Sequence, residues 1–197
     1  MITVIEHPLI AQKLATMRQV ETPPHLFREL LEELSMLMAF EVTRTVPTRL
    51  VEVETPLGRG KFPVADTTFA IIPILRAGLG MLGGILKLIP TARVGHIGMW
   101  RDEKTLQPVQ YYCKLPPDLE RRTVIVVDPM LATGNSVSAA LQLVKKHGGQ
   151  HIRFMCLLAT PQGIDRVLRD HPEVQIFTAA VDPELNDRGY IVPGLGD

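Results

Sequence analysis

The sequence predicts one α/β domain with a twisted, mainly parallel sheet and helices on both of its faces. Along most of the chain, strand patterns alternate with helical patterns, which is typical of parallel sheets. The strand patterns are continuous apolar runs, as expected for strands that helices cover on both sides. No linker-like segment divides the 197 residues, so we expect a single domain over residues 1–197.

Two amphipathic helices are expected before the first buried strand. The first covers residues 7–19 and the second covers residues 22–46, where Thr22 is expected to act as the N-cap and two prolines to occupy the first turn. The alternating segment 49–63 is broken by glycines and predicts a β-hairpin.

The sheet itself is expected to begin with a strand over residues 68–75. A helix over 78–90 and a strand over 92–100 follow. Segment 101–116 is first polar and then alternating, so we expect a loop with a projecting β-arm there. The remaining elements are predicted in turn as strand 123–128, helix 135–148, strand 151–159, helix 160–172 and strand 174–182.

The composition gives no reason to expect nucleic acid or a membrane as a partner. The chain has 21 Lys and Arg against 21 Asp and Glu, so its formal net charge is zero. No apolar stretch reaches membrane-spanning length, and no signal-peptide pattern opens the sequence. The two cysteines, Cys113 and Cys156, lack metal-like spacing and suggest no disulfide framework, so we expect a cytoplasmic protein.

The strand over 123–128 ends in Asp128, and a loop of small polar residues follows. Backbone N–H groups at the start of the next helix are free to face an anion, and the helix dipole contributes about 0.3–2 kcal/mol to such binding. Thr133 and Ser136 add hydroxyl donors. A carboxylate beside a phosphate pocket suits sugar hydroxyls or a metal, so a ribose with a 5′-phosphate fits both parts. Taken alone, Asp128 and its loop would equally suit an ordinary helix cap.

Arg76 also follows a predicted strand, and ligands bind beyond the carboxyl ends of such strands. Its planar guanidinium can hold diphosphate oxygens in pairs, although a lone arginine after a strand is often only a surface residue. Gly78, Gly80 and Gly83 form a G-x-G-x-x-G pattern with Asp102 some twenty residues later. That pattern alone is a weak indication of a dinucleotide-binding dehydrogenase, because Arg76 precedes the first glycine where a tight turn is required.

Several segments in order resemble the type I phosphoribosyltransferases, and among them the uracil phosphoribosyltransferase family. They include "IIPILRAGLGM", "VGHIGMWRDEKT", "VVDPMLATGNS" and "RGYIVPGLGD". The resemblance covers nearly the whole chain. It implies the fold of that family and the conversion of uracil and 5-phosphoribosyl 1-diphosphate (PRPP) to UMP and diphosphate, a step of pyrimidine salvage.

The resemblance also assigns roles to residues. Asp128 and Arg101 are implied as catalytic, and the segment 101–105 as a cover over the reacting centre. Uracil is expected at Tyr190, Ile191, Gly196 and Asp197, where a rigid backbone can match its hydrogen-bonding edge and reject cytosine. PRPP is expected at Arg76, Arg101, Asp128, Pro129, Met130, Leu131, Ala132, Thr133, Gly134, Asn135, Ser136 and Asp197.

Partners and cofactors follow from the same resemblance. It implies Mg²⁺, and because Val127 replaces the first of two paired acids common in related folds, we expect no direct protein ligand and a metal held mainly by substrate and water. It further implies GTP as an effector. The alternating arm at residues 108–116 is expected to pair with another subunit, because a lone projecting ribbon has exposed edges, so we expect a homodimer or higher homo-oligomer. The remaining alternatives are a nucleotide-sensing regulator that binds RNA, which zero net charge disfavours, and an enzyme of different base specificity.

Two departures from the family pattern are visible. Asn135 stands where the family usually has a second glycine, and asparagine tolerates left-handed backbone well, so the loop is still expected to close. The family usually continues past Gly-Leu-Gly-Asp with a short tail, whereas the sequence ends at Asp197. Part of the base site is therefore expected to be absent from these residues.

Overall fold

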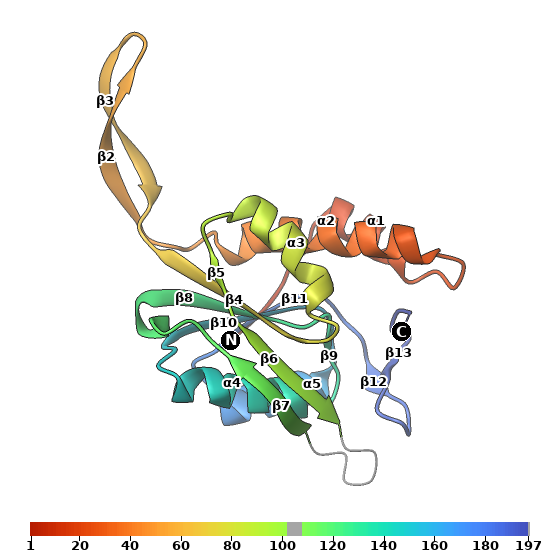
Figure 1. Cartoon of the computed structure of the whole chain (residues 1–197). Helices are drawn as coiled ribbons and strands as arrows, with labels where there is room; N and C mark the ends of the chain where they lie inside the picture. The colour runs from red at the N-terminus through yellow and green to blue at the C-terminus, as the bar shows by residue number, and fades with distance from the viewer. Residues whose placement is uncertain (102–107, 197) are drawn as a thin grey trace.

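The computed structural model describes residues 1–101 and 108–196, with the side chain of Arg101 left out. These residues form a nine-stranded sheet with the main order β1-β11-β10-β8-β4-β6-β7, in which β5 pairs with β4 and β9 with β10 (Figure 1). Every pair is parallel except β6 with β7. The strands are β1 (Ile2–Val4), β4 (Thr68–Leu75), β5 (Arg93–Val94), β6 (His96–Arg101), β7 (Pro108–Lys114), β8 (Arg122–Val127), β9 (Met130–Leu131), β10 (His151–Ala159) and β11 (Gln175–Val181).

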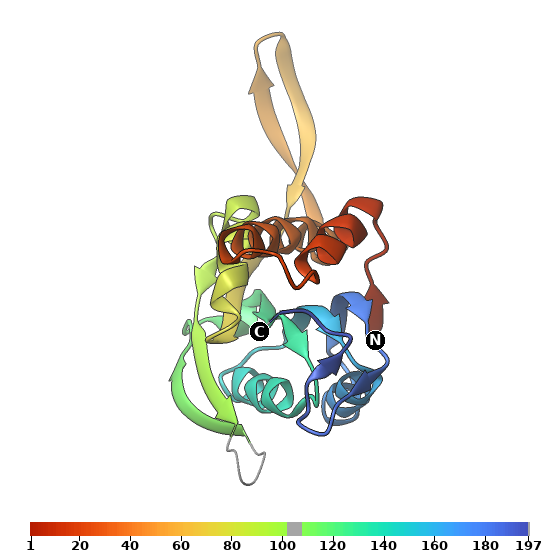
Figure 2. The same ribbon diagram turned by 90° about the vertical axis from the view of Figure 1, so that its right-hand side faces the viewer.

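Helices cover both faces of this sheet (Figure 2). On one face α1 (Pro8–Met17), α2 (Pro24–Val42) and α3 (Leu79–Leu88) enclose one apolar core, and on the other α4 (Asn135–Lys146) and α5 (Pro161–Asp170) enclose a second. Alternate residues of each strand serve the two cores: Val127 faces the first and Val126 the second. This division explains why the strands are apolar at every position. The prediction of a mainly parallel α/β sheet is confirmed.

The helix ends follow local chemistry, with one correction. The Thr160 side chain caps α5 by accepting a hydrogen bond of 3.0 Å from Gly163 N–H, and Pro161 occupies the first turn. The predicted cap at Thr22 is wrong: Pro23 precedes α2, and the Thr22 hydroxyl instead donates to the carbonyl of Thr16 at 2.5 Å. The Thr22 side chain therefore stabilises the turn after α1.

The projecting arm is not where the alternating pattern of 101–116 placed it. Residues 108–114 form β7, which lies flat against β6 as an antiparallel edge strand. The arm is the predicted hairpin instead, formed by β2 (Thr48–Thr55) and β3 (Gly58–Ala65), which extends away from the body (Figures 1 and 2). Both regions alternate because each has one solvated face, so the pattern cannot tell an edge strand from an arm.

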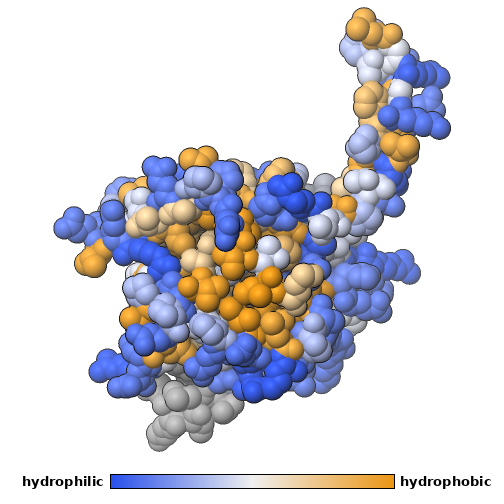
Figure 3. Space-filling view, turned by 180° about the vertical axis from the view of Figure 1, so that it is seen from behind, coloured by the Kyte–Doolittle hydropathy of each residue, from blue (hydrophilic) through white to orange (hydrophobic). Residues whose placement is uncertain are grey.

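Apolar side chains lie on the surface in two places. On the arm, Leu57 at the tip is fully exposed, and Leu50 and Phe62 are exposed along it. Behind the view of Figure 1, β1 forms the edge of the sheet with Met1 and Val4 exposed, and apolar residues gather on this side (Figure 3). Strand β1 itself was not predicted. No helix within the described ranges is long and apolar enough to cross a membrane.

The chain closes with a short hairpin of β12 (Glu184–Leu185) and β13 (Ile191–Val192). Ile191 is the first residue of β13, whereas Tyr190 lies just before this strand and is exposed. Gly194 has a φ of 67°, in the left-handed region. A Cβ at this position would lie 2.3 Å from the carbonyl oxygen of Ile191, so the turn after β13 requires glycine.

Candidate active site

Asp128 lies directly after β8, in the middle of the parallel sheet. Its backbone N–H donates to the carbonyl of Met155 on β10 at 3.2 Å, and its carboxylate accepts from Met130 N–H at 3.3 Å. The carbonyl of Pro129 accepts hydrogen bonds from Leu157 and Leu158. Backbone contacts on both sides therefore fix the position of the carboxylate.

The Asp128 side chain is partly exposed, but much of its surroundings is protein. Burial raises the pKa of its carboxyl to about 7, and the hydrogen bond from Met130 opposes this rise. At neutral pH the group is therefore divided between its neutral and charged forms. Sugar hydroxyls that donate to it would favour the charged form, because hydrogen bonds to a carboxylate lower its pKa.

The loop after Asp128 turns into α4 through a left-handed glycine. Gly134 has a φ of 80°, and a Cβ there would lie 2.8 Å from the carbonyl oxygen of Gly163. Asn135 and Ser136 begin α4, so the free N–H groups of its first turn lie beside the loop. The predicted turn from strand to helix is present, and Asn135 does not prevent it.

The first turn of α5 holds this loop in place. Thr160 N–H donates to the carbonyl of Leu131 at 3.0 Å, and the Thr160 hydroxyl donates to that of Ala132 at 2.7 Å. Gly163 packs so closely that a Cβ would lie 2.4 Å from the Ala132 oxygen. Sequence reasoning missed these supports, although Thr-Pro at the start of a helix is a recognisable cap pattern.

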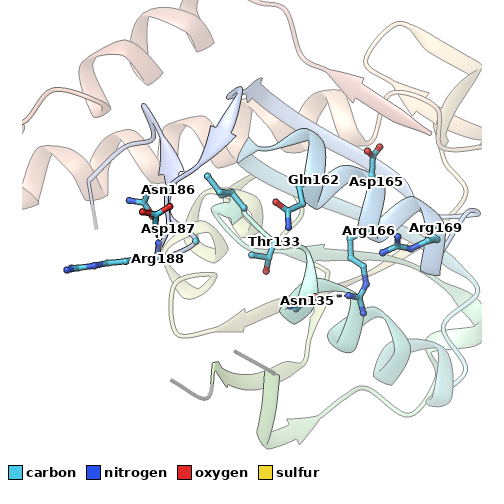
Figure 4. A pocket seen from close by; sticks show the side chains of 11 residues that line it. Thr133, Asn135, Gln162, Asp165, Arg166, Arg169, Asn186, Asp187 and Arg188 are labelled. Atoms are coloured by element: carbon cyan, nitrogen blue, oxygen red, sulfur yellow. Dashed lines mark hydrogen bonds between the residues drawn. The ribbon is translucent and has the colours of Figure 1, made fainter. Parts of the chain in front are cut away.

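A cavity of about 930 Å³ opens beside the loop (Figure 4). Thr133 and Asn135 line it from the loop, α5 contributes arginines, and the turn between β12 and β13 completes it. Sequence reasoning did not select the cavity residues outside the loop, which are Gln162, Asp165, Arg166, Arg169, Leu185, Asn186, Asp187, Arg188 and Gly189. Thr133 and Asn135 of the predicted phosphate loop line this cavity, whereas Asp128 and the predicted uracil residues Tyr190, Ile191 and Gly196 do not.

The C-terminal segment is anchored by an ion pair from the N-terminal helices. Arg18 donates two hydrogen bonds of 2.7 Å to Asp182 and one of 2.6 Å to the carbonyl of Gly194. Asp182 also accepts from Gly194 N–H at 2.9 Å, and Arg18 lowers the pKa of this carboxyl. Both backbone groups of Gly194 are therefore occupied.

The remaining predicted residues divide into three groups. Arg76 follows β4, is exposed, and does not line the cavity; the peptide bond before it is cis. Pro129 and Leu131 are buried, so their side chains are not available to a ligand within this loop. Asp102, Glu103, Thr105 and Asp197 lie outside the described residues, and the Arg101 side chain does too.

An aspartate at a strand end, a left-handed glycine and a helix N-terminus, on a mainly parallel sheet, agree with the fold of the type I phosphoribosyltransferases, which the comparisons with known structures show. The hypoxanthine-guanine phosphoribosyltransferase of Bacillus anthracis shares this fold, with a TM-score of 0.52 and 12% identity over 80% of each chain. The family model for uracil phosphoribosyltransferase matches residues 4–197, and the chain belongs to that family. It is therefore an enzyme of the pentosyl-transferring class.

Individual relatives agree with this assignment. The chain is 58% identical over 197 residues to the uracil phosphoribosyltransferase of Clostridium perfringens, covering 100% of this chain and 94% of that protein. Its identity to that of Dictyoglomus turgidum is 54% over 198 residues, with 100% and 96% covered. The solved structure of the AQ2163 protein from Aquifex aeolicus has a TM-score of 0.95 at 39% identity, with 100% of this chain and 95% of that one covered.

Proposed function

We propose that this enzyme transfers the phosphoribosyl group of PRPP to N1 of uracil. The bond from ribose C1 to the diphosphate oxygen breaks, the C1–N1 bond forms, and the N1 proton is released. The products are UMP and diphosphate. One observation carries the proposal: Asp128 stands at a rigid strand end beside a left-handed glycine loop, in a chain that matches this family over residues 4–197.

Asp128 has the central role in this mechanism. Its carboxylate accepts hydrogen bonds from the ribose hydroxyls. Its negative charge then stabilises the ribose as C1 becomes cation-like, because a preorganised charge needs no rearrangement as the reaction proceeds. The backbone contacts of Asp128 and Pro129 to β10 supply that preorganisation.

The loop positions the opposite end of the sugar. Thr133, Gly134, Asn135 and Ser136 hold the 5′-phosphate with hydroxyl, amide and backbone donors at the start of α4. The backbone around Met130 and Ala132 lies between phosphate and ribose. Arg76 and Arg101 bind the diphosphate, for which an arginine fork is well suited.

Uracil is recognised by the segment after β12. Ile191 is buried, so its backbone and the turn to Gly196 present fixed donors and acceptors, and Tyr190 and Asp197 also belong to the site. Uracil offers one donor at N3 between two acceptors. Cytosine has an amino group in place of one acceptor, which would leave a buried donor without a partner.

Mg²⁺ is proposed as the cofactor of the reaction. The residues offer such an ion no set of direct ligands: Val127 beside Asp128 is apolar, the Asp128 carboxylate is assigned to the ribose hydroxyls, and no group of three or more His, Cys, Asp or Glu gathers within the described ranges. Substrate oxygens and water would hold the ion, which suits a metal that keeps several waters. When bound, Mg²⁺ supplies countercharge to the diphosphate.

A homodimer or higher homo-oligomer is supported by the arm rather than by β7. The β2–β3 hairpin projects with exposed apolar residues at Leu50, Leu57 and Phe62. A lone two-stranded ribbon is marginal in water, so a second copy of the chain is its expected partner. No nucleic acid or membrane partner is proposed.

GTP activation and a cytoplasmic location complete the proposal. GTP is implied by the resemblance alone, and a comparison of initial rates with and without GTP tests it. Cys113 and Cys156 are free thiols, which favours a reducing compartment. Imaging of a tagged chain in its host tests the location.

The decisive experiment is product formation. The protein is incubated with PRPP, Mg²⁺ and one base at a time, and nucleotides are separated by chromatography. We expect UMP from uracil and at least a hundredfold less CMP from cytosine, in the range that unpaired buried polar groups enforce. Equal turnover of both bases would contradict the proposed recognition.

A further inference from the structure

Asn135 is held by an arginine from a different helix. Its Oδ1 accepts a hydrogen bond of 2.9 Å from Nη1 of Arg166 on α5, which Figure 4 marks with a dashed line. Arg166 in turn donates from Nε to Oδ2 of Asp170 at 2.6 Å. The Ser138 hydroxyl donates to the same Asp170 oxygen at 2.7 Å. The chain of contacts therefore begins and ends on α4.

The chemistry of arginine decides how the Asn135 amide is turned. A guanidinium has only donors, so the amide must present its oxygen to Arg166 and direct its NH₂ group elsewhere. Within the part of the chain that the structure describes, no acceptor takes a hydrogen bond from Asn135 Nδ2. Asn135 lines the cavity together with Thr133. The two N–H donors of the Asn135 side-chain amide are therefore available to an anion in that cavity.

Arg166 itself is firmly placed. A Cβ at Gly134 would lie 2.9 Å from Arg166 Cβ, so the helix α5 approaches the loop closely at this point. Asp170 is one turn further along α5, and Arg166 and Ser138 together lower the pKa of its carboxyl to about 2. The carboxylate is therefore charged at physiological pH and accepts the hydrogen bond from Nε of Arg166.

We propose that Arg166 is a positioning residue for the 5′-phosphate. It orients the Asn135 amide so that Nδ2–H donates to the phosphate, a contact that glycine at 135 could not supply. The inference rests on the proposed function in taking the 5′-phosphate of PRPP as the anion. It assigns the role to a residue of α5, outside the loop sequence itself.

The test measures binding of ribose 5-phosphate by titration calorimetry, and the Michaelis constants for PRPP and uracil. We expect Arg166→Ala and Asn135→Ala each to weaken ribose 5-phosphate about tenfold and to raise the KM for PRPP similarly, the usual size for a lost hydrogen bond to a charge. The kcat and the KM for uracil should change less than twofold. The double variant should be no weaker than either single one, because both act through one amide.

Three further variants separate positioning from mere packing. Arg166→Lys, which also only donates, should recover most of the affinity. Asn135→Asp keeps the partner of Arg166 but has no N–H, so it should bind at least as weakly as Asn135→Ala. Arg121→Ala removes the same charge before β8, at the opposite end of that strand, and should leave binding unchanged.

Additive losses in the double variant, or an Asn135→Asp protein that binds as the wild type does, would overturn the inference. Failure of the wild-type protein to bind ribose 5-phosphate would overturn the phosphate site and the inference together. Binding without formation of UMP would leave the inference standing and reject only the proposed reaction.

Discussion

Arg18 and Asp182 form a two-pronged ion pair across 164 positions of sequence, with both hydrogen bonds 2.7 Å long. Asp182 directly follows β11, the strand that leads into the C-terminal segment, and Arg18 directly follows α1. The pair also engages both backbone groups of Gly194. The end of α1 thus supports the C-terminal segment, to which we assign uracil binding.

Arg18→Ala should therefore weaken uracil binding more than PRPP binding. We expect the KM for uracil to rise about tenfold and the free energy of unfolding to fall by roughly 2–3 kcal/mol, because Asp182 would keep a largely buried charge with fewer partners. Urea titration and initial rates measure the two effects. Lys13→Ala, which breaks an exposed pair with Glu33, serves as the control and should cost less than about 1 kcal/mol.

Asp128→Asn should lower kcat by about 10²–10³, which corresponds to roughly 2.7–4 kcal/mol of lost transition-state stabilisation. The KM for PRPP should change much less, since asparagine can still bond a hydroxyl. Ser136→Ala should show the reverse pattern, a raised KM for PRPP with kcat nearly kept. An intact kcat in Asp128→Asn would mean that Asp128 only positions the substrate.

The raised pKa of Asp128, about 7 against an ordinary 3.8, makes a prediction for stability against pH. The folded state binds the proton more tightly than the unfolded state, so stability is lost as the pH rises from about 4 to 7. Melting temperatures should show the wild type losing stability relative to Asp128→Asn over this window, with no further change above it. Parallel curves for the two proteins would contradict the assignment of this pKa.

Ionisation of the Asp128 carboxyl also predicts how the activity falls at low pH. In kcat/KM for PRPP we expect a limb with a midpoint near pH 7, where the Asp128 carboxyl of the free enzyme ionises. The 5′-phosphate titrates near pH 6 and adds a limb of its own. The pH profile of Asp128→Asn should show only the limb caused by titration of the 5′-phosphate. Comparing it with the wild-type profile therefore separates this titration from that of Asp128.

Gly163→Ala should disturb the loop from the side of α5. A methyl group there would lie 2.4 Å from the Ala132 oxygen and 2.7 Å from that of Leu131, and neither backbone atom can move without shifting the loop. We expect a loss of about 1–3 kcal/mol in stability and a raised KM for PRPP. Gly83→Ala on α3 meets only the end of the Glu32 side chain, at 3.2 Å, and should be neutral or slightly stabilising.

Removal of the arm should change the assembly. Replacing residues 49–64 by a short turn, or Leu57→Asp at the tip, should reduce the mass in light scattering toward that of one chain. Val20→Asp, at a fully exposed position after α1, should leave the mass unchanged. A wild-type protein that is monomeric at micromolar concentration would refute the proposed oligomer.

The sequence predicted the sheet and the loop well because both are local patterns. Continuous apolar runs defined β4, β8 and β10, and the Asp128 loop is a single stretch from strand to helix. Features that depend on distant contacts were missed. Arg18 gives no local signal for its partner, and Arg166 gives only an ordinary pairing with Asp170 four residues on.

The arm shows a second reason why a sequence pattern alone does not determine the structure. Segments 49–63 and 108–114 both alternate, and only the tertiary partner decides which one projects. Strand β7 pairs with β6 in the main sheet, whereas β2 and β3 pair with each other. Likewise Thr22 and Thr160 both precede Pro, but only Thr160 caps a helix, because an extra proline after Thr22 shifts the start of α2.

The pairing of β1 with β11 constrains how the chain can mature during synthesis. Ile2 aligns with Ile176 and Val4 with Thr178, so the first strand made must wait for one of the last. Until then the edge of β1 and the apolar side chains beside it stay open, while the intervening strands can already assemble. Pairing of strands so far apart in sequence is slow, and until it occurs the exposed apolar surface favours aggregation. The nascent enzyme is thus expected to need protection by chaperones until β11 has left the ribosome.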